Sequence, residues 1–167
     1  MREWLLDLAY IIFGIFLALA VNQALALALS TDMPVVAVES NSMVPTFYKG
    51  DLLVLVGTPP EELKPGDIIV FSPDPGSTPI VHRVIYINPD GTFQTKGDAN
   101  PHQLPFEKSI RPESIHGKVI AIIPFLGWVK ILFTELVLPN LFWIALIIIL
   151  GYSLNWGWRR WKHAVLS

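Results

Sequence analysis

An apolar run near the N-terminus constrains this chain more than any other feature. From Leu8 to Leu29 nearly every residue is apolar, and Asn22 and Gln23 are the strong polar interruptions. About 20 helical residues cross the hydrocarbon core of a bilayer, so this run is long enough to span it. A cleavable signal peptide is the alternative, because alanines alternate from Ala24 to Ala28, but its apolar region would be shorter. The length favours a retained anchor over residues 1–30.

A second apolar run extends from Leu136 to Tyr152. It predicts a transmembrane helix over residues 136–155, with a buried core helix as the alternative. The tail that follows, residues 156–167, mixes aromatic and cationic side chains, which is typical of a cytoplasmic exit from the membrane. These side chains are Trp156, Trp158, Arg159, Arg160, Trp161 and Lys162. With both ends on the cytoplasmic side, residues 31–135 would form an extracytoplasmic domain of a multi-pass protein in the cell membrane.

Composition excludes several classes of function. The hydrophobic fraction of 52% exceeds the usual range for a soluble domain, and the excess lies at the two ends. The net charge of -2 gives no reason to expect nucleic acid as a partner. Because the chain has no cysteine, it can form neither disulfides nor zinc sites built on thiolates. No cofactor or metal is expected.

Between the apolar runs the sequence predicts a mainly β domain. Short β-branched runs alternate with turns rich in Gly, Pro and Asp. The sequence Asn88-Pro89-Asp90-Gly91 is typical of a turn that joins two strands as a hairpin. The expected strands are 35–38, 52–56, 68–71, 80–87, 92–95 and 115–123. About a hundred residues of this kind favour a small β-barrel or folded sheet with its own core.

Ser42 is the candidate nucleophile. It lies in Glu39-Ser40-Asn41-Ser42-Met43-Val44-Pro45-Thr46, directly after a predicted strand, where a turn could project its hydroxyl. A serine hydroxyl is a poor nucleophile near neutral pH and needs a base within about 3 Å. Without such a base, Ser42 would be an ordinary turn serine.

His82 is the candidate base. Strand alternation places it on one face with Ile80, Val84 and Tyr86, and a general base must be a neutral imidazole. A half-buried strand histidine bonded to a carbonyl is the alternative. The other histidines have weaker contexts, in a loop, beside a glycine and near the C-terminus; they are His102, His116 and His163.

Asp98 is the candidate acid. It follows a glycine in Thr95-Lys96-Gly97-Asp98-Ala99-Asn100, at a loop where a carboxylate could orient a histidine and stabilise the imidazolium. A simple Asx turn is the alternative. Lys96 is the nearby lysine that could act as a base instead, if it were desolvated.

Three blocks in this order resemble the type I signal peptidase family, in its archaeal and endoplasmic reticulum branch. The first is Ser40-Asn41-Ser42-Met43-Val44-Pro45-Thr46, which matches the family's S-x-S-M-x-P-T. The second is Gly66-Asp67-Ile68-Ile69-Val70-Phe71 followed by His82-Arg83-Val84, and the third is Lys96-Gly97-Asp98-Ala99-Asn100. The resemblance implies a small β domain flanked by N- and C-terminal transmembrane helices.

The resemblance also implies roles for individual residues. Ser42 would be the nucleophile, and His82 occupies the place where the bacterial branch has a lysine base. Asp98 matches the acid of the K-G-D-x-N block. Ser40 and the backbone amide of Ser42 would form the oxyanion hole.

One position departs from the family pattern. Members of this branch often carry a second acid shortly after the first, where Gln103 and Leu104 stand here. Either Asp98 acts alone, or Glu107 reaches in from a shifted loop.

The implied activity is that of a membrane-bound serine endopeptidase that cleaves signal peptides from exported preproteins. Its partners would be those signal peptides, the lipid bilayer and the secretion translocon. The alternatives are a specialised processing peptidase for surface-fibre subunits, which would carry the same motifs, and a non-catalytic membrane adaptor, which would be expected to lose Ser42 or His82. A transporter subunit is disfavoured, because neither apolar run has an ionisable residue at its centre.

Overall fold

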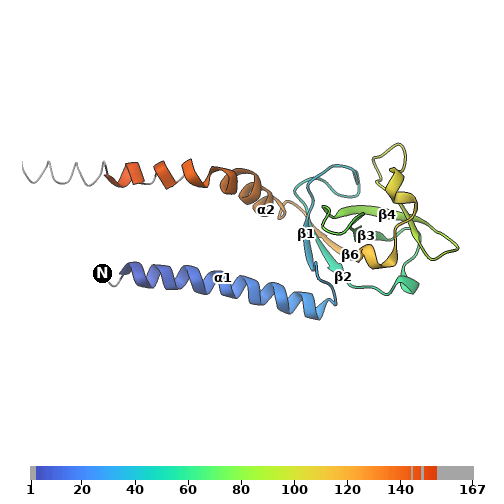
Figure 1. Ribbon diagram of the computed structural model, residues 1–167, viewed down its shortest axis with the longest axis horizontal. Helices are drawn as coiled ribbons and strands as arrows, with labels where there is room; N and C mark the ends of the chain where they lie inside the picture. Colours follow the sequence, from blue (N-terminus) through green and yellow to red (C-terminus); the bar gives the residue numbers. More distant parts are fainter. Residues whose placement is uncertain (1–2, 144, 148, 154–167) are drawn as a thin grey trace, which may run out of the picture. The chain divides into compact units, whose positions relative to one another are not determined.

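The computed structural model describes residues 3–143, 145–147 and 149–153. Its first element is helix α1 (Glu3–Ala28), drawn in blue in Figure 1. Residues Leu5–Ala28 form a helix that is long and apolar enough to cross a membrane, and its most apolar stretch of 18 residues has a mean hydropathy of 2.2 and no buried residue. The predicted N-terminal anchor therefore has the length and composition that a membrane span requires.

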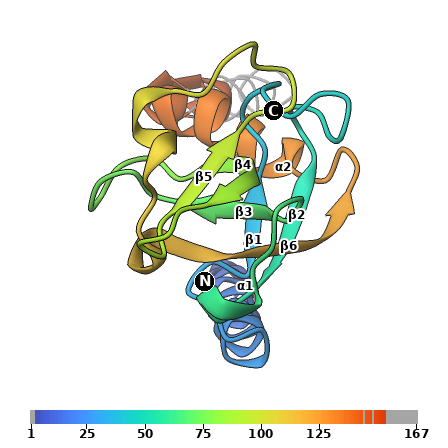
Figure 2. The same cartoon turned by 90° about the vertical axis from the view of Figure 1, so that its right-hand side faces the viewer.

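The domain that follows is a six-stranded antiparallel sheet, so the mainly β prediction is confirmed. Figures 1 and 2 show its strands, in the order β1-β2-β6-β3-β4-β5. They are β1 (Val35–Ala37), β2 (Leu52–Val56), β3 (Ile68–Phe71), β4 (Ile80–Ile87), β5 (Phe93–Lys96) and β6 (Ile115–Ile123). Short 3-10 turns join them: η1 (Pro60–Glu62), η2 (Pro105–Lys108) and η3 (Pro112–Ser114). Each strand begins and ends within one residue of its predicted range. The reason is that Gly and Pro turns on either side of each run limit where a strand can begin and end.

The predicted hairpin between β4 and β5 is also confirmed. Gly91 N donates to Asn88 O at 3.0 Å, and Asn88 N donates to Thr92 O at 2.8 Å. Gly91 has a φ of 82°, in the left-handed region that glycine adopts at low cost. The turn thus brings β5, with the block that begins at Lys96, beside His82 on β4.

A β-bulge in β4 overturns part of the predicted alternation. Val84 pairs with Thr95 but Tyr86 pairs with Gln94, so Ile85 is the extra residue. An extra residue reverses which side chains face inward beyond it. His82 and Val84 are buried as predicted, whereas Tyr86 is 52% exposed and does not share their face.

The domain has two apolar clusters, and one of them supports the nucleophile loop. The first cluster consists of Leu63, Ile69, Phe71, Val84, Phe93 and Ile110. The second consists of Val38, Met43, Phe47 and Leu53, so two of its members come from the turn that holds Ser42. Burying each such side chain contributes roughly 1.5–3 kcal/mol relative to exposure, which ties this turn to the sheet.

The chain divides into two compact units at Gly127 and Trp128. The second unit begins with α2 (Trp128–Leu132), η4 (Phe133–Val137) and η5 (Leu138–Asn140). Its helical segments Trp128–Trp143 and Ala145–Ser153 are long and apolar enough to cross a membrane only when they are taken together, and they are bent by 45° relative to each other. The predicted cytoplasmic tail, residues 156–167, lies outside the described residues.

Candidate active site

The nucleophile loop is a series of turns between β1 and β2, anchored by the buried side chains of Met43 and Phe47. Met43 and Phe47 are 1% and 2% exposed, while Ser42 is only half buried. Asn41 Oδ1 accepts a hydrogen bond from Lys49 N at 2.8 Å, which closes the loop. These contacts hold the backbone of the loop in place, so the position of the Ser42 hydroxyl is fixed.

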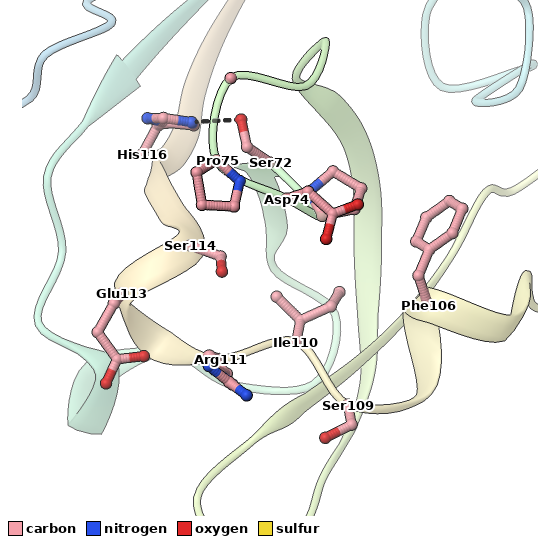
Figure 3. Close-up of a pocket in the computed structure, with 12 residues that line it drawn as sticks. Ser72, Asp74, Pro75, Phe106, Ser109, Ile110, Arg111, Glu113, Ser114 and His116 are labelled. Atoms are coloured by element: carbon pink, nitrogen blue, oxygen red, sulfur yellow. Dashed lines mark hydrogen bonds between the residues drawn. The ribbon is translucent and has the colours of Figure 1, made fainter.

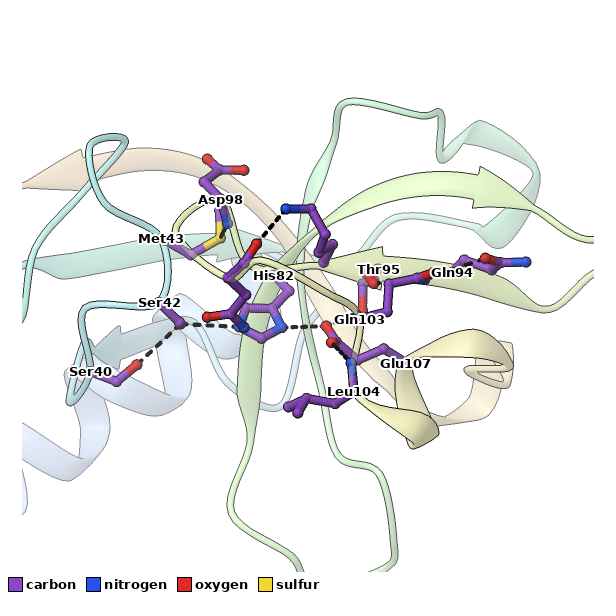
Figure 4. A network of polar contacts seen from close by, with 12 residues as sticks. Ser40, Ser42, Met43, His82, Gln94, Thr95, Asp98, Gln103, Leu104 and Glu107 are labelled. Carbon is purple, nitrogen blue, oxygen red and sulfur yellow. Dashed lines mark hydrogen bonds and ion pairs between the residues drawn. The ribbon is translucent and has the colours of Figure 1, made fainter.

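His82 meets this hydroxyl from the middle of β4. Its Nε2 lies 3.0 Å from Ser42 Oγ, although the two residues are 40 positions apart in the sequence (Figure 4). Its pairing with Ile69 on β3 fixes the backbone position of His82, and the side chain is only 3% exposed. This distance is within the reach required between a nucleophile and its base.

The partner of the other imidazole nitrogen is Glu107. His82 Nδ1 contacts Glu107 Oε1, and the side chain of Glu107 has no exposed surface (Figure 4). Thr95 Oγ1 donates to the same oxygen at 3.0 Å, and Leu104 N donates to Oε2 at 2.7 Å. A buried carboxylate with partners on both oxygens holds the imidazole in one orientation and leaves Nε2 facing the serine.

Asp98, the acid favoured by sequence, lies elsewhere. Its carboxylate accepts hydrogen bonds from Arg83 Nε at 2.9 Å, Arg83 Nη2 at 2.6 Å and Thr46 Oγ1 at 2.5 Å. Successive strand residues point to opposite faces, so a carboxylate bonded to Arg83 is directed away from the face of His82. The structure thus brings Ser42, His82 and Glu107 together and separates Asp98 from that chain of contacts.

The environment of Asp98 is that of a structural ion pair. Hydrogen bonds from Arg83 are the largest cause that lowers the pKa of the Asp98 carboxyl, and burial opposes them. The same bonds raise the pKa of Arg83. Because Arg83 Nη2 also donates to Thr46 Oγ1 at 3.1 Å, the pair ties the nucleophile loop to β4 and to the end of β5. No local sequence pattern indicated this role of Arg83, although strand alternation placed Arg83 on the opposite face from its neighbour His82.

The backbone after β5 passes close to the reacting groups. Ala99 N donates to Ser42 O at 2.8 Å. A Cβ on Gly97 would lie 2.7 Å from Ser42 O and 2.8 Å from His82 Nε2. Only glycine fits there without displacing one of these groups.

Ser40 and Lys96 can also be placed. Ser40 Oγ lies 3.2 Å from Ser42 Oγ, so it borders the space beside the nucleophile. Within the described part of the chain, no acceptor meets the backbone amide of Ser42. Lys96, the alternative base, donates from Nζ to Asn100 O at 2.6 Å. The base in contact with Ser42 Oγ is therefore His82. Among the residues that the structure describes, no group of three His, Cys, Asp or Glu side chains could hold a metal ion.

The site therefore has a serine hydroxyl, an imidazole and a buried carboxylate in consecutive contact, which is the arrangement of a Ser-His-acid triad, on a small antiparallel sheet. The family profile described as "Signal peptidase, peptidase S26" matches residues 4–96. The chain belongs to this signal peptidase family, and the relationship predicted from three sequence motifs is confirmed.

The relatives are catalytic subunits of signal peptidase complexes. The chain is 32% identical to "Signal peptidase complex catalytic subunit SEC11C" of Rattus norvegicus over 143 residues, covering 80% of this chain and 73% of the relative. It is 32% identical to the protein of the same name from Homo sapiens over 127 residues, covering 71% and 66% of the two chains. It is 37% identical to "Signal peptidase complex catalytic subunit sec11" of Sclerotinia sclerotiorum over 122 residues, covering 68% and 71%.

The matched range of the family profile includes some site residues and omits others. It covers Ser42 and His82 but ends at residue 96, before Asp98 and Glu107. The choice between the two acids therefore depends on the geometry described above.

Proposed function

We propose that this protein is a membrane-bound serine endopeptidase that removes N-terminal signal peptides from exported preproteins. Ser42 is the nucleophile, His82 is the general base, and Glu107 orients His82. The observation that supports this assignment is the chain of contacts from Ser42 Oγ through both nitrogens of His82 to Glu107. Asp98 takes a positioning role in place of the catalytic role that sequence favoured.

Acylation begins at the 3.0 Å contact between Ser42 and His82. Ser42 Oγ attacks the scissile carbonyl carbon while its proton passes to Nε2. Glu107 holds the Nδ1 proton and stabilises the imidazolium that forms. His82 then gives the proton to the amine of the departing mature protein, and the signal peptide remains as an ester on Ser42.

The negative charge on the carbonyl oxygen needs donors that are already in place. The backbone amide of Ser42 and the hydroxyl of Ser40 fill this role, and each such donor lowers the barrier by about 3 kcal/mol. Ser40 Oγ at 3.2 Å from Ser42 Oγ supports this assignment. Water, activated by the same imidazole, then hydrolyses the ester and restores Ser42.

The activity takes place at a membrane, with the catalytic domain on the extracytoplasmic face of a multi-pass protein. Helix α1 supports the first crossing, and the bent pair of segments after Trp128 supports the second. The end of β6 and the residues after it support a location of the domain at the membrane surface, because this stretch is apolar and exposed on both of its faces. The residues are Ile120, Ala121, Ile122, Ile123, Phe125 and Leu126. Such a surface suits the headgroup region, where a signal helix would present its cleavage site.

The buried carboxylate of Asp51 holds part of this surface in place. It accepts hydrogen bonds from Phe125 N at 3.1 Å and from Tyr48 N at 2.9 Å. Both aromatic side chains are mostly exposed, at 75% for Phe125 and 53% for Tyr48. Asp51 therefore links the apolar surface to the loop that carries Ser42.

The contact chain favours an enzyme over a non-catalytic adaptor, which would have no use for a buried carboxylate behind an imidazole. Since the relatives are named as subunits of a complex, partner subunits and a link to the secretion translocon belong to the same proposal. A peptidase dedicated to surface-fibre subunits would use the same site, and a survey of substrates separates the two.

Incubation of the detergent-solubilised protein with a labelled preprotein tests the proposal. The wild type should release the signal peptide, and Ser42→Ala and His82→Ala should not, with folding checked by circular dichroism. Full processing by folded Ser42→Ala would reject the nucleophile, and a failure of the wild type on every preprotein tried would reject the activity.

A further inference from the structure

Outside the site described above, a second serine and a second histidine form a similar contact. Ser72 Oγ lies 2.9 Å from His116 Nε2, and His116 Nδ1 lies 3.0 and 3.2 Å from the two carboxylate oxygens of Asp32. The residues come from separate parts of the chain: Asp32 follows α1, Ser72 follows β3, and His116 lies on β6. His116 is 44 positions from Ser72 and 84 from Asp32, so tertiary structure brings the three side chains together.

The backbone around these residues is fixed by further hydrogen bonds. Thr31, which precedes Asp32, is 8% exposed and donates from Oγ1 to the carbonyl of His116 at 2.6 Å. Ser72 N donates to Ser114 O at 2.9 Å, at the edge where β3 pairs with β6. A carboxylate on Nδ1 favours the tautomer in which Nε2 accepts a proton, so the Ser72 hydroxyl donates to it.

The serine and the histidine open into a cavity. Its volume is about 690 Å³, and Figure 3 shows Ser72 and His116 on one wall of it. Phe106 and Ile110 supply apolar surface on other walls, and Arg111 also lines the cavity. This volume lies within the range of small-molecule sites, roughly 300–1,000 Å³. Ser42 and His82 are not among the residues that line it.

We propose that Ser72, His116 and Asp32 form a second nucleophilic site, which hydrolyses esters of small, apolar carboxylic acids. Ser72 Oγ forms a bond to the ester carbonyl carbon as its proton passes to His116 Nε2. The protonated imidazole returns this proton to the leaving alkoxide as the ester C–O bond breaks. Water then attacks the acylated serine by the same route, which releases the acid and restores Ser72.

Two features make this site slower than the one at Ser42. The side chain of Asp32 is 68% exposed, so water competes with His116 for its carboxylate. The backbone amide of Ser72 is already bonded to Ser114 O, so the oxyanion must rely on side chains of the cavity, such as the Ser114 hydroxyl. A donor that is not held in place stabilises the transition state less than a fixed backbone amide does.

The test uses the full chain with Ser42→Ala, which separates this site from the proposed peptidase site. A fluorophosphonate probe reports a serine that a histidine activates, because phosphorus bonds to Oγ, fluoride leaves and the serine proton goes to the imidazole. Mass spectrometry should locate the label on Ser72, and the protein should hydrolyse p-nitrophenyl butyrate. Adding Ser72→Ala or His116→Ala should lower both rates at least tenfold, whereas the cavity-lining control Ser109→Ala should not.

Asp32 is a positioning residue here, and its variants separate that role from general stability. Asp32→Asn should slow labelling several-fold, and Asp32→Glu should restore part of the rate at an unchanged melting temperature. Absence of label on Ser72, or equal ester hydrolysis with and without Ser72→Ala, would overturn the proposal. Preprotein cleavage by Ser72→Ala in an otherwise wild-type chain should be unaffected, so failure here leaves the peptidase proposal intact.

Discussion

The carboxylate of Glu107 contacts Nδ1 of His82 in the interior of the domain, where neither side chain is more than 4% exposed. Glu107 lies on a 3-10 turn that begins at Pro105, and its other oxygen accepts the backbone amide of Leu104. The turn therefore fixes the carboxylate, the carboxylate fixes the imidazole, and the imidazole faces Ser42.

Gly97→Ala should slow cleavage strongly without unfolding the protein. Its Cβ would lie within 2.8 Å of Ser42 O and His82 Nε2, so one of the two groups must move. A displacement of about 1 Å at reacting atoms costs roughly 100-fold in rate. The measurement is kcat on a preprotein, with Gly14→Ala as the control, since a Cβ at Gly14 would have no atom within 4 Å apart from its chain neighbours and the adjacent backbone of α1. Wild-type kcat in Gly97→Ala would show that the loop after β5 does not constrain the site.

Asp98→Asn should weaken the fold near neutral pH more than in acid. The bonds from Arg83 lower the pKa of Asp98 in the folded protein below its ordinary value of 3.8. A lowered carboxyl pKa contributes stability that is present above the ordinary value and is lost as pH falls through the folded value. We expect the variant to lose about 1 kcal/mol at pH 7, because the pair is partly exposed.

Thermal melts at pH 7 and pH 3 measure this difference. The gap in melting temperature between wild type and Asp98→Asn should be smaller at the lower pH. Asp74→Asn is the matched control, since no hydrogen bond or ion pair of the Asp74 side chain occurs among the described residues. A gap that widens in acid would contradict the ion-pair role of Asp98.

Phe125→Asp should impair cleavage at a membrane and spare cleavage in solution. The side chain is 75% exposed at the apolar end of β6, and a charge there disfavours insertion of this stretch at the boundary between headgroups and acyl chains. We expect roughly tenfold slower processing of a preprotein in vesicles, and an unchanged rate on a soluble peptide that spans the cleavage site. Thr78→Asp, on the exposed β3–β4 loop, should change neither rate. Equal losses on both substrates would instead indicate damage to the catalytic domain.

Local sequence patterns were sufficient to predict the strands. The apolar run Ile68 to Phe71, for example, is bounded by the turn residues Gly66-Asp67 and by Ser72, and these limits match those of β3. The bulge at Ile85 was not predictable, because it depends on how β4 pairs with β5, and no local pattern marks an unpaired residue. It explains why Tyr86 is exposed.

The sequence alone could not decide whether Asp98 or Glu107 contacts His82, because the two carboxylates lie on opposite faces of β4. Asp98 bonds Arg83, which points to the opposite face from its neighbour His82. Glu107 reaches His82 only because the turn at Pro105 folds over Thr95. Strand alternation along β4 was sufficient to predict the face on which Arg83 lies. The path of the loop after Asn100 was not predictable, because it depends on tertiary packing.

We propose that Glu107, and not Asp98, orients His82. The most direct test is the rate of preprotein cleavage by Glu107→Gln and Asp98→Asn, measured side by side on proteins of verified fold. An amide in place of the orienting carboxylate lowers kcat by about 10⁴ in a well-studied serine protease, so Glu107→Gln should lose roughly 10³–10⁴-fold and Asp98→Asn less than about tenfold. An active Glu107→Gln beside an inactive Asp98→Asn would show that Asp98, and not Glu107, supports His82.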